Sequence, residues 1–555
     1  MIEYENKKQN LEPVSASGNI EIYKLPRPGK YKWIEELRGV FSTWTPLGGR
    51  DHSIRQWWFP NASSSVYQCG SPLLSTMDSE GVNRVTVALS DTFSRSHLTV
   101  SVDDLNQRDE IIFTVETKSE NAFLRVDRRA VDYCDAVTEA GEWMRSYLKD
   151  GQIPVPDNAE LPLYSSWYNF HQEPEQYLLE KELKIASEMG FKTFILDDGW
   201  QFEGKNTGSY QLCGEWKLAK DKFPDFKGFC DRVHGFGIKI LMWFAVPFVG
   251  FDSPEYVRLK DKLAFDNAPF GAGVLDIRYP EIRRHIIGIL KRYAHDYGID
   301  GLKLDFIDAF NMEAEHIPPY NDDMDVCTLD EAAVLLMDEI YATMTDINKD
   351  FLFEFRQNYI GAQIVNRCNM LRVADCAADP ITNRIGIVAL RLVNKGTAIH
   401  SDMLLWGKRE SALNCQRQLL NIMFSVPQIS VRLTEIPEEQ LDIIGRFVSY
   451  WTENRDILLH GRFRAYHPES NYTVIFAESD EKKITVLHAE PLFTPCGKCE
   501  DVFNDTPYDY IVPSTDECFD YTVYDLYGKE IFTGNSNTKR RIDLPRGGMM
   551  RIKAK

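Results

Sequence analysis

The sequence lacks any hydrophobic run long enough to cross a membrane. Its longest apolar stretches, such as residues 240–250, fall short of the roughly 20 residues that a spanning helix needs. No apolar core follows the charged first residues, so no signal peptide is predicted. We therefore expect a cytoplasmic protein with no membrane partner, although a trimmed chain with an added methionine would begin in the same way.

Basic side chains are in deficit. The chain has 63 Lys and Arg against 83 Asp and Glu, which gives a net charge of −20 and a pI near 5.1. A protein with this balance repels nucleic acids and anionic lipid surfaces. We expect no nucleic-acid partner, and a neutral substrate is favoured over a phosphorylated one.

Histidine is scarce as well, with 11 residues, and the 11 cysteines are scattered. Cys496 and Cys499 form a single CxxC, and only His488 and Cys518 lie near enough in sequence to complete a zinc site. A loop turn explains the pair more simply. We expect no metal and no organic cofactor.

The chain is too long for one hydrophobic core and divides by pattern into three regions. Residues 1–150 alternate polar and apolar positions and end in one amphipathic segment, which predicts an N-terminal β-sandwich with a linker helix. Residues 151–455 alternate short apolar runs with amphipathic segments, which predicts a (β/α)₈ TIM barrel. Residues 456–555 return to alternation, so we expect a small C-terminal β-sandwich. The predicted class is multidomain α/β plus all-β.

Eight short apolar runs are the expected barrel strands. They lie near residues 163–168, 193–196, 239–244, 301–305, 351–355, 371–374, 398–400 and 428–431. In such barrels the chemistry lies at the carboxyl ends of the strands. Side chains that close these runs are therefore the candidates for a site.

The fourth run contains the first candidate. Residues 298–306 read Gly-Ile-Asp-Gly-Leu-Lys-Leu-Asp-Phe, and on a strand Lys303 and Asp305 point to the same face. A lysine beside Asp305 favours its anion, which suits a carboxylate that attacks. A structural Lys–Asp pair explains this segment equally well.

The second run ends in two acids and an aromatic residue. Asp197, Asp198 and Trp200 follow residues 193–196, with Gly199 as a turn between them. Carboxylates accept hydrogen bonds from sugar hydroxyls, and an aromatic ring stacks on the apolar face of a sugar. Trp167, at the end of the first run, is a further candidate for stacking, although core packing explains it as well.

A glycosidase also needs a proton donor. Asp375 closes the sixth run and has apolar neighbours, so we expect its pKa to be raised and its carboxyl to stay protonated near neutral pH. Asp379 follows in the next loop and, with Glu354, is a rival for this role. Alternatively, either aspartate stabilises a loop or caps a helix and has no catalytic role.

The order of these segments resembles the α-galactosidases of glycoside hydrolase family 36 and their clan relatives. The resemblance implies a β-sandwich, a (β/α)₈ barrel, a C-terminal β domain and retention of anomeric configuration. It implies that Asp305 is the nucleophile, that Asp197 and Asp198 bind hydroxyls, and that Asp375 in Arg-x-x-Asp is the acid/base. From the residues and the resemblance together, the candidate substrate-binding set is Asp197, Asp198, Trp200, Trp243, Lys303, Arg356, Arg372, Asp379 and Trp167.

One segment departs from the family pattern. Many members carry a Cys-Ser-Gly-Gly run after the fifth strand, where this chain has Glu-Phe-Arg-Gln at residues 354–357. Arg356 or Gln357 is therefore expected to contact the sugar, and galactose specificity does not follow. Glu354 is interpreted as the partner of an arginine, with the rival-acid interpretation left open.

The leading hypothesis is a retaining exo-α-glycosidase that acts on an oligosaccharide or glycoside. A transglycosidase of the raffinose-synthase type would use the same residues. A metal-dependent barrel enzyme, with ligands such as Asp197, Glu354, Asp375 or His400, and a non-catalytic sugar-binding protein are the other classes. A homo-oligomer is possible, and the sequence names neither the sugar nor the linkage.

Overall fold

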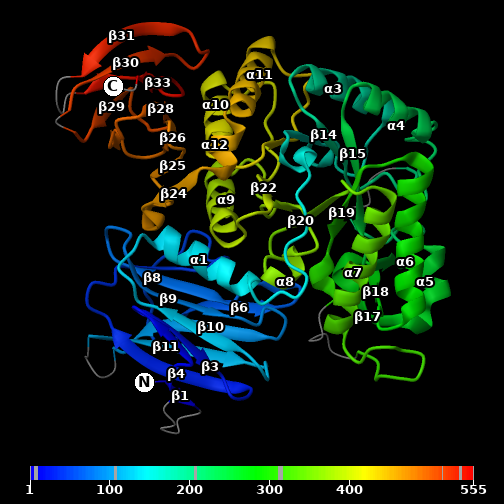
Figure 1. Cartoon of the computed structure of the whole chain (residues 1–555). Coiled ribbons are helices and arrows are strands. Elements are labelled where there is room, and N and C mark those ends of the chain that lie inside the picture. The colour runs from blue at the N-terminus through cyan, green and yellow to red at the C-terminus, as the bar shows by residue number, and fades with distance from the viewer. Residues whose placement is uncertain are drawn as a thin grey trace.

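The computed structural model describes residues 2–4, 11–104, 109–204, 209–310, 317–515, 517–536 and 541–553. Three parts follow one another along the chain, and Figure 1 shows the two β-sandwiches stacked on one side of a barrel. The predicted fold class is confirmed: a barrel of parallel strands lies between two all-β parts. The predicted domain boundaries remain a prediction.

The N-terminal part is a sandwich of two six-stranded antiparallel sheets around its own hydrophobic core. Buried and open positions alternate along residues 61–66 and 110–117 of the first sheet, as expected when one face of a sheet is covered. The first sheet runs β1 (Glu3–Tyr4), β4 (Gly29–Glu36), β11 (Glu110–Thr117), β10 (Ser96–Val102), β6 (Asn61–Val66), β7 (Cys69–Gly70). The second runs β2 (Ser15–Ser17), β3 (Ile20–Lys24), β12 (Phe123–Asp127), β9 (Asn83–Leu89), β8 (Leu73–Met77), β5 (Ser42–Trp44).

The barrel has eight strands, each starting within one residue of its predicted position. Their order is β22 (Ala398–His400), β21 (Met370–Arg372), β20 (Leu352–Arg356), β19 (Gly301–Asp305), β15 (Lys239–Ala245), β14 (Thr193–Leu196), β13 (Leu163–Ser165), β23 (Gln428–Ile429). All named pairs are parallel, and a parallel bridge from His400 to Val426 brings β22 beside the entry to β23. These strands are almost wholly buried, as parallel strands covered on both faces must be.

The first barrel strand is shorter than predicted. It was expected to reach Tyr168 but ends at Ser165, because the chain turns and Phe170 N donates to Ser166 O at 3.0 Å. Trp167 consequently lies in a one-turn helix at the carboxyl end of the barrel rather than on a strand.

Helices surround the barrel. The longer ones are α3 (Gln176–Glu188), α4 (Phe226–Gly235), α6 (Pro280–Arg292), α7 (Leu329–Ile347), α9 (Pro380–Val393), α10 (Ala412–Asn421) and α11 (Glu438–Glu453). Shorter ones are α2 (Trp167–Phe170), α5 (Pro254–Leu259), α8 (Ala362–Val365), α12 (Arg455–His460), η1 (Asp157–Glu160), η2 (Lys260–Lys262), η3 (Ala268–Phe270), η4 (Tyr293–Tyr297), η5 (Ile307–Ala309) and η6 (Pro468–Ser470). An antiparallel insert of β16 (Phe248–Gly250), β18 (Ala272–Leu275) and β17 (Leu263–Asn267) follows β15.

The C-terminal part packs a seven-stranded sheet against a three-stranded one around a third core. The larger sheet runs β24 (Arg462–Tyr466), β25 (Val474–Glu478), β26 (Lys482–Leu487), β28 (Cys499–Asn504), β33 (Met549–Ile552), β30 (Phe519–Tyr524), β31 (Glu530–Ser536). The smaller runs β27 (Leu492–Phe493), β29 (Tyr510–Pro513), β32 (Ile542–Asp543).

The N-terminal sandwich is attached to the barrel by a helix and by loops. Helix α1 (Tyr133–Arg145) crosses α9 so closely that a Cβ on Gly141 would meet Val393 O at 2.4 Å. Loops of the sandwich reach those that follow β19 and β20, where Gly70 N donates to Asn358 O at 2.8 Å. The sandwich therefore borders the carboxyl end of the barrel.

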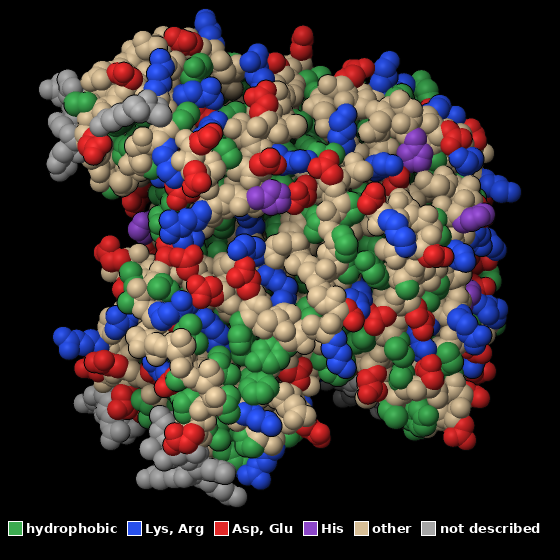
Figure 2. Space-filling view, in the orientation of Figure 1, with side chains coloured by type: hydrophobic (Ala, Val, Ile, Leu, Met, Phe, Trp, Pro, Cys, Tyr) green, Lys and Arg blue, Asp and Glu red, His purple; other side chains and the backbone are tan. Residues whose placement is uncertain are grey.

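The outer surface carries both signs of charge. Figure 2 shows acidic and basic side chains interspersed over one face, which is indented between the two sandwiches. In the part of the chain that the structure describes, no helix is both long and apolar enough to cross a membrane.

Candidate active site

A cavity of about 340 Å³ opens at the carboxyl ends of the barrel strands, and we call it the carboxylate cavity. It is lined by Trp167, Asp197, Asp198, Tyr210, Trp243, Lys303, Asp305, Phe306, Arg356, Ala374 and Asp375. These residues follow six different strands or their loops, so only the closed barrel brings them together. The structure thus gathers eight of the eleven residues that the sequence nominated into one cavity.

Asp305 ends β19 and is the most heavily bonded carboxylate of the cavity. Its Oδ2 accepts from Trp243 Nε1 at 3.0 Å, and its Oδ1 accepts from Arg356 Nε at 2.7 Å and Tyr359 OH at 3.1 Å. Burial alone would raise the pKa of Asp305, but Arg356 and then Lys303 hold this pKa well below its usual range. Asp305 is therefore an anion at any pH near neutrality.

The lysine beside Asp305 has a different direct partner from the one expected. Lys303 Nζ donates to Asp197 Oδ2 at 2.6 Å, and both groups are almost completely buried. Lys303 still lowers the pKa of Asp305 through its charge, while Arg356 makes the direct ion pair. The prediction that Lys303 favours the Asp305 anion agrees with this effect, but the sequence did not show that Arg356 makes the direct ion pair.

Asp198 lies beside Asp197 at the end of β14 and is held by two amides. Gln172 Nε2 donates to its Oδ2 and Gln201 Nε2 to its Oδ1, each at 2.6 Å. Burial raises the pKa of Asp198 to about 6, because the two amides do not compensate for the loss of water. Each oxygen keeps acceptor capacity on the cavity side, which suits hydroxyl groups.

Asp375 follows β21 and contacts a buried arginine. Arg372 Nη1 lies 2.8 Å from Asp375 Oδ1 and also contacts Asp402 Oδ1. Burial works to raise the pKa of Asp375, but the charge of Arg372 outweighs it and holds the pKa below its ordinary value. The expectation of a raised pKa was wrong, because it counted the apolar sequence neighbours and missed the arginine three residues earlier.

Glu354 lies beneath the cavity rather than in its lining. It is fully buried on β20, accepts from Gln428 Nε2 at 2.6 Å and lies 3.7 Å from Arg372 Nε. Burial raises the pKa of Glu354 to about 6. The interpretation of Glu354 as the partner of an arginine agrees with this position.

Three nominated residues are not among those that line the cavity. Trp200 is buried behind it, with Nε1 donating to Trp243 O at 3.0 Å, because the Gly199 turn directs the ring into the core. Arg372 is buried below Asp375. Asp379 caps α9 through Thr382 N at 3.1 Å and pairs with Arg50 of the N-terminal sandwich.

Two aromatic residues of the lining were missed. Tyr210 lies on the loop after β14, and its ring packs edge-on against Phe306 at 4.8 Å between centroids. Phe306 follows Asp305 directly and has a φ of +59°, which a side chain seldom adopts outside functional sites. The sequence offered one clue to Phe306, its place after the candidate nucleophile, and none to Tyr210.

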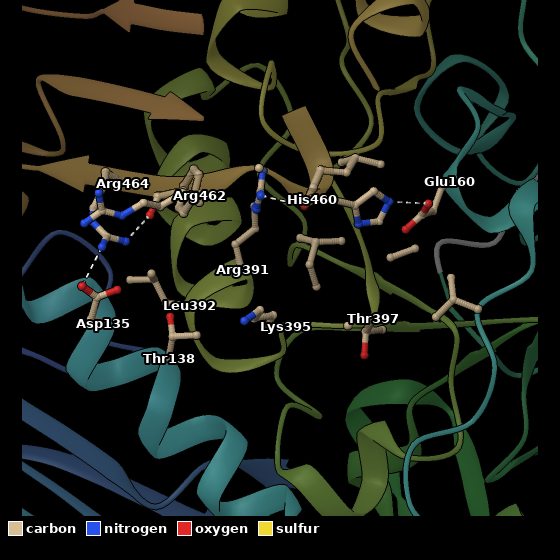
Figure 3. A pocket seen from close by; sticks show the side chains of 17 residues that line it. Asp135, Thr138, Glu160, Arg391, Leu392, Lys395, Thr397, His460, Arg462 and Arg464 are labelled. Atoms are coloured by element: carbon tan, nitrogen blue, oxygen red, sulfur yellow. Dashed lines mark hydrogen bonds and ion pairs between the residues drawn. The ribbon is translucent and has the colours of Figure 1, made fainter. Parts of the chain in front are cut away.

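A larger cavity, of about 690 Å³, lies between α1, the start of β22, α12 and β24 (Figure 3). We call it the junction cavity. Basic residues dominate it, yet Arg464 pairs with Asp135 at 2.6 Å and His460 with Glu160 at 3.0 Å. It lies at the amino end of β22, opposite the ends where the carboxylates gather.

No group of three or more His, Cys, Asp or Glu among the described residues has the spacing of a metal site. His488, a candidate partner of the CxxC, instead contacts Asp505 at 2.9 Å.

Known proteins resemble this chain in sequence over its barrel. Residues 144–357 match the family model for melibiase. The α-galactosidase Mel36A of Lactobacillus acidophilus is 31% identical over 169 residues, which cover 29% of this chain and 22% of that protein. An α-xylosidase of Emericella nidulans is 31% identical over 173 residues, or 28% of this chain and 21% of that protein. The matched part of the chain thus spans about a fifth of the length of these relatives.

Solved structures resemble it over almost its whole length. The family 36 α-galactosidase AgaA of Geobacillus stearothermophilus, solved in complex with raffinose, has a TM-score of 0.67 at 13% identity. The match covers 97% of this chain and 80% of that one. The resemblance to glycoside hydrolase family 36 that the motifs indicated is confirmed, and the fold is that of its α-galactosidases.

Proposed function

We propose that this protein is a retaining exo-α-glycosidase of the α-galactosidase type, acting on the terminal sugar of an oligosaccharide or glycoside. One observation carries the proposal: a buried carboxylate kept anionic, Asp305, shares a cavity with a second carboxyl, Asp375, and an acidic pair. The melibiase match and the α-galactosidase relatives support the same activity.

In the proposed first step, Asp305 attacks the anomeric carbon. Asp375 gives its proton to the glycosidic oxygen, the bond from carbon to that oxygen breaks, and the alcohol leaves. In the second step Asp375 takes a proton from water, whose oxygen attacks the same carbon and releases Asp305. The sum is glycoside plus water to sugar plus alcohol, with configuration retained.

The charge of Asp305 helps to switch Asp375 between its two roles. While Asp305 is an anion, it raises the pKa of Asp375 against the opposing effect of Arg372. In the covalent ester that charge is gone, so Arg372 acts unopposed and the Asp375 anion, which is the base, becomes favoured. The proton of Asp375 is thus held better before the ester forms than after it, while Arg372 keeps the pKa below its ordinary value in both states.

The acidic pair is proposed to hold the sugar. Asp198 offers acceptors for hydroxyls, and Lys303 with Asp197 supplies both a donor and acceptors at the same wall. Trp167 and Trp243 border the cavity on its aromatic side. Such fixed polar groups reject a sugar that leaves them unpaired.

The test is a panel of α-glycosyl fluorides and nitrophenyl α-glycosides of galactose, glucose and xylose, with β-anomers as controls. We expect turnover of α-anomers only, with the α-product appearing first by proton NMR. Xylose belongs in the panel because one relative is an α-xylosidase. Inversion of configuration, or turnover of β-anomers alone, would contradict the proposal.

Arg356 is proposed to set the sugar preference. It contacts Asp305 directly and lines the cavity, where many family members have small residues. We expect Arg356→Ala to lower all rates, by losing the charge beside Asp305, and also to change the ranking of sugars in the panel. Arg356→Lys is the matched control: it should recover part of the rate while the ranking stays altered. An unchanged ranking in both variants would make Arg356 a partner of Asp305 only.

A further inference from the structure

A small second cavity begins where the carboxylate cavity ends. Its volume is about 170 Å³, and the two cavities share Ala374 and Asp375. We call it the side cavity. Asp375 therefore stands between two spaces, one that also contains Asp305 and one that does not. A donor in this position delivers its proton where a sugar in the first space is joined to a group in the second.

Three distant parts of the chain build the side cavity. The loop of residues 45–52 after β5 forms one wall, the ends of β20 and β21 with α9 form another, and Tyr472 closes it from the C-terminal part. Arg50 Nη2 fixes the loop by donating to Asp379 Oδ1 at 2.9 Å and Oδ2 at 2.7 Å. This explains the position of Asp379, which anchors the wall of the side cavity instead of lining the carboxylate cavity.

The lining of the side cavity is largely apolar. It includes Pro46, Leu47, Val373, Ile385 and Ala389.

Several of its polar groups already have hydrogen-bond partners, whereas Nε2 of His52 is buried without one among the described residues. Trp44 Nε1 donates to Tyr472 OH at 3.0 Å, and Thr382 Oγ1 donates to Asp379 Oδ2 at 2.7 Å. Gln357 Oε1 accepts from Ala374 N at 3.3 Å. A second sugar has several hydroxyls that need partners when they are buried, and groups already paired give it few.

We propose that the side cavity receives the leaving group of the substrate, and that this group is a compact, mainly apolar alcohol or phenol of about one ring. The proposal rests on the proposed glycosidase function and adds the class of substrate. For scale, a dry cavity of about 150 Å³ in another protein binds benzene. When Asp375 protonates the glycosidic oxygen, the alcohol is released on the side of Leu47 while the sugar stays bonded to Asp305.

The experiment keeps the sugar constant and varies the leaving group. With the best sugar of the panel, kcat/KM is measured for the fluoride, the methyl, the cyclohexyl and the phenyl α-glycoside, and a disaccharide. We expect the cyclohexyl and phenyl compounds to exceed the disaccharide by roughly tenfold, the scale on which an apolar pocket discriminates. The fluoride has no group to place in the side cavity and reports the sugar chemistry alone.

Two matched leucine variants sharpen the result. Leu47 of the side cavity is 40% exposed and Leu492 of the C-terminal part is 50% exposed, so Leu→Ser should be tolerated at both. We expect Leu47→Ser to lower the ratio of cyclohexyl to fluoride kcat/KM roughly three- to tenfold, and Leu492→Ser to leave this ratio unchanged.

The outcomes separate the two proposals. Turnover of the fluoride with the same ratio in both variants, or a wild-type preference for the disaccharide, overturns the leaving-group assignment and leaves the glycosidase function standing. Failure of every α-glycosyl fluoride in the wild type overturns both.

Discussion

The carboxylate cavity and the junction cavity differ in a way that volume does not reveal. The junction cavity is about twice as large, 690 against 340 Å³, and richer in basic residues. Yet Arg391, which Figure 3 labels, donates to the carbonyl oxygens of Leu458 and Leu459 at the end of α12 and to that of Phe424, which follows α10. The charge of Arg391 thus caps the carboxyl end of a helix and holds separate segments of the chain together.

In the carboxylate cavity several charged groups face one space. Asp198 is buried with a raised pKa, and Asp305 is kept anionic by cations gathered around it. Perturbed groups of this kind cluster where chemistry takes place. Burial also lowers the pKa of Arg391 in the junction cavity to about 9, so a perturbed pKa alone does not distinguish the two regions. They differ in what their charged groups face: Asp198 and Asp305 line one open space, whereas the donors of Arg391 are taken up by carbonyl oxygens.

The largest effect should come from Asp305. We expect Asp305→Asn to lower kcat by at least about 10⁴-fold, since losing a nucleophile costs on this scale. Asp305→Gly with added azide should restore part of the turnover and give a β-glycosyl azide, detected by NMR. His460→Gln in the junction cavity is the control and should stay within twofold of wild type. Activity near wild type in Asp305→Asn would contradict the proposal that the carboxylate cavity, rather than the junction cavity, is the active site.

Asp375 should follow. We expect Asp375→Ala to lower kcat on alkyl α-glycosides by about 10²- to 10⁴-fold, the usual contribution of general acid catalysis. On the fluoride, whose departure needs no proton, the first step should be affected far less. Burst kinetics with the fluoride would then reveal a slow second step. An equal loss on alkyl glycosides and fluoride would exclude Asp375 as the donor.

The pH dependence of kcat/KM should distinguish a carboxyl that lines the carboxylate cavity from one buried outside it. Asp198 and Glu354 both have a pKa raised to about 6, but only Asp198 lines the carboxylate cavity. We expect kcat/KM on the fluoride, whose departure needs no proton, to rise with pH through about 6, roughly tenfold from pH 5 to 7, as Asp198 ionises and accepts hydroxyls. Asp198→Asn should abolish this rise, and Glu354→Gln should keep it. If Glu354→Gln alone removed the rise, the buried network below the cavity would be the titrating site.

The same pair should behave alike in stability. A carboxyl whose folded pKa is raised loses stability as pH rises from its ordinary pKa to about 6, because the unfolded chain gives up its proton first. In the wild type, each carboxyl should lower the free energy of unfolding by up to about 2 kcal/mol between pH 4 and pH 7. Each substitution should abolish the part of this decrease that its carboxyl causes, as measured by urea titration at the two pH values.

The smallest effect on activity is expected at Arg391. Arg391→Met should lower the free energy of unfolding by about 1–3 kcal/mol, because helix carbonyls lose a charged donor. The kcat/KM of the folded enzyme should stay within twofold of wild type. A loss of activity beyond that, with stability intact, would give the junction cavity a role in function.

Much of this could be predicted from the sequence, because barrel strands are short, apolar and end in the residues that matter. The run at 301–305 identified β19, Lys303 and Asp305 without a structure. Pairings across strands could not be predicted. Arg356 reaches Asp305 over 51 positions, and the partner of Lys303 is 106 positions away. The prediction for the pKa of Asp375 failed for a different reason: Arg372 is only three residues away in sequence, but the sequence does not show that its guanidinium contacts Asp375.

The closure of the barrel has a consequence for synthesis. Strand β13 pairs with β23, and Ser430 Oγ donates to Ser165 O across 265 positions of the chain. On the ribosome the first strand therefore has one open edge until nearly the whole barrel has emerged. Such edges recruit other strands, and non-local pairings form slowly. We expect the nascent chain to depend on chaperones for the interval between its first strand and its last.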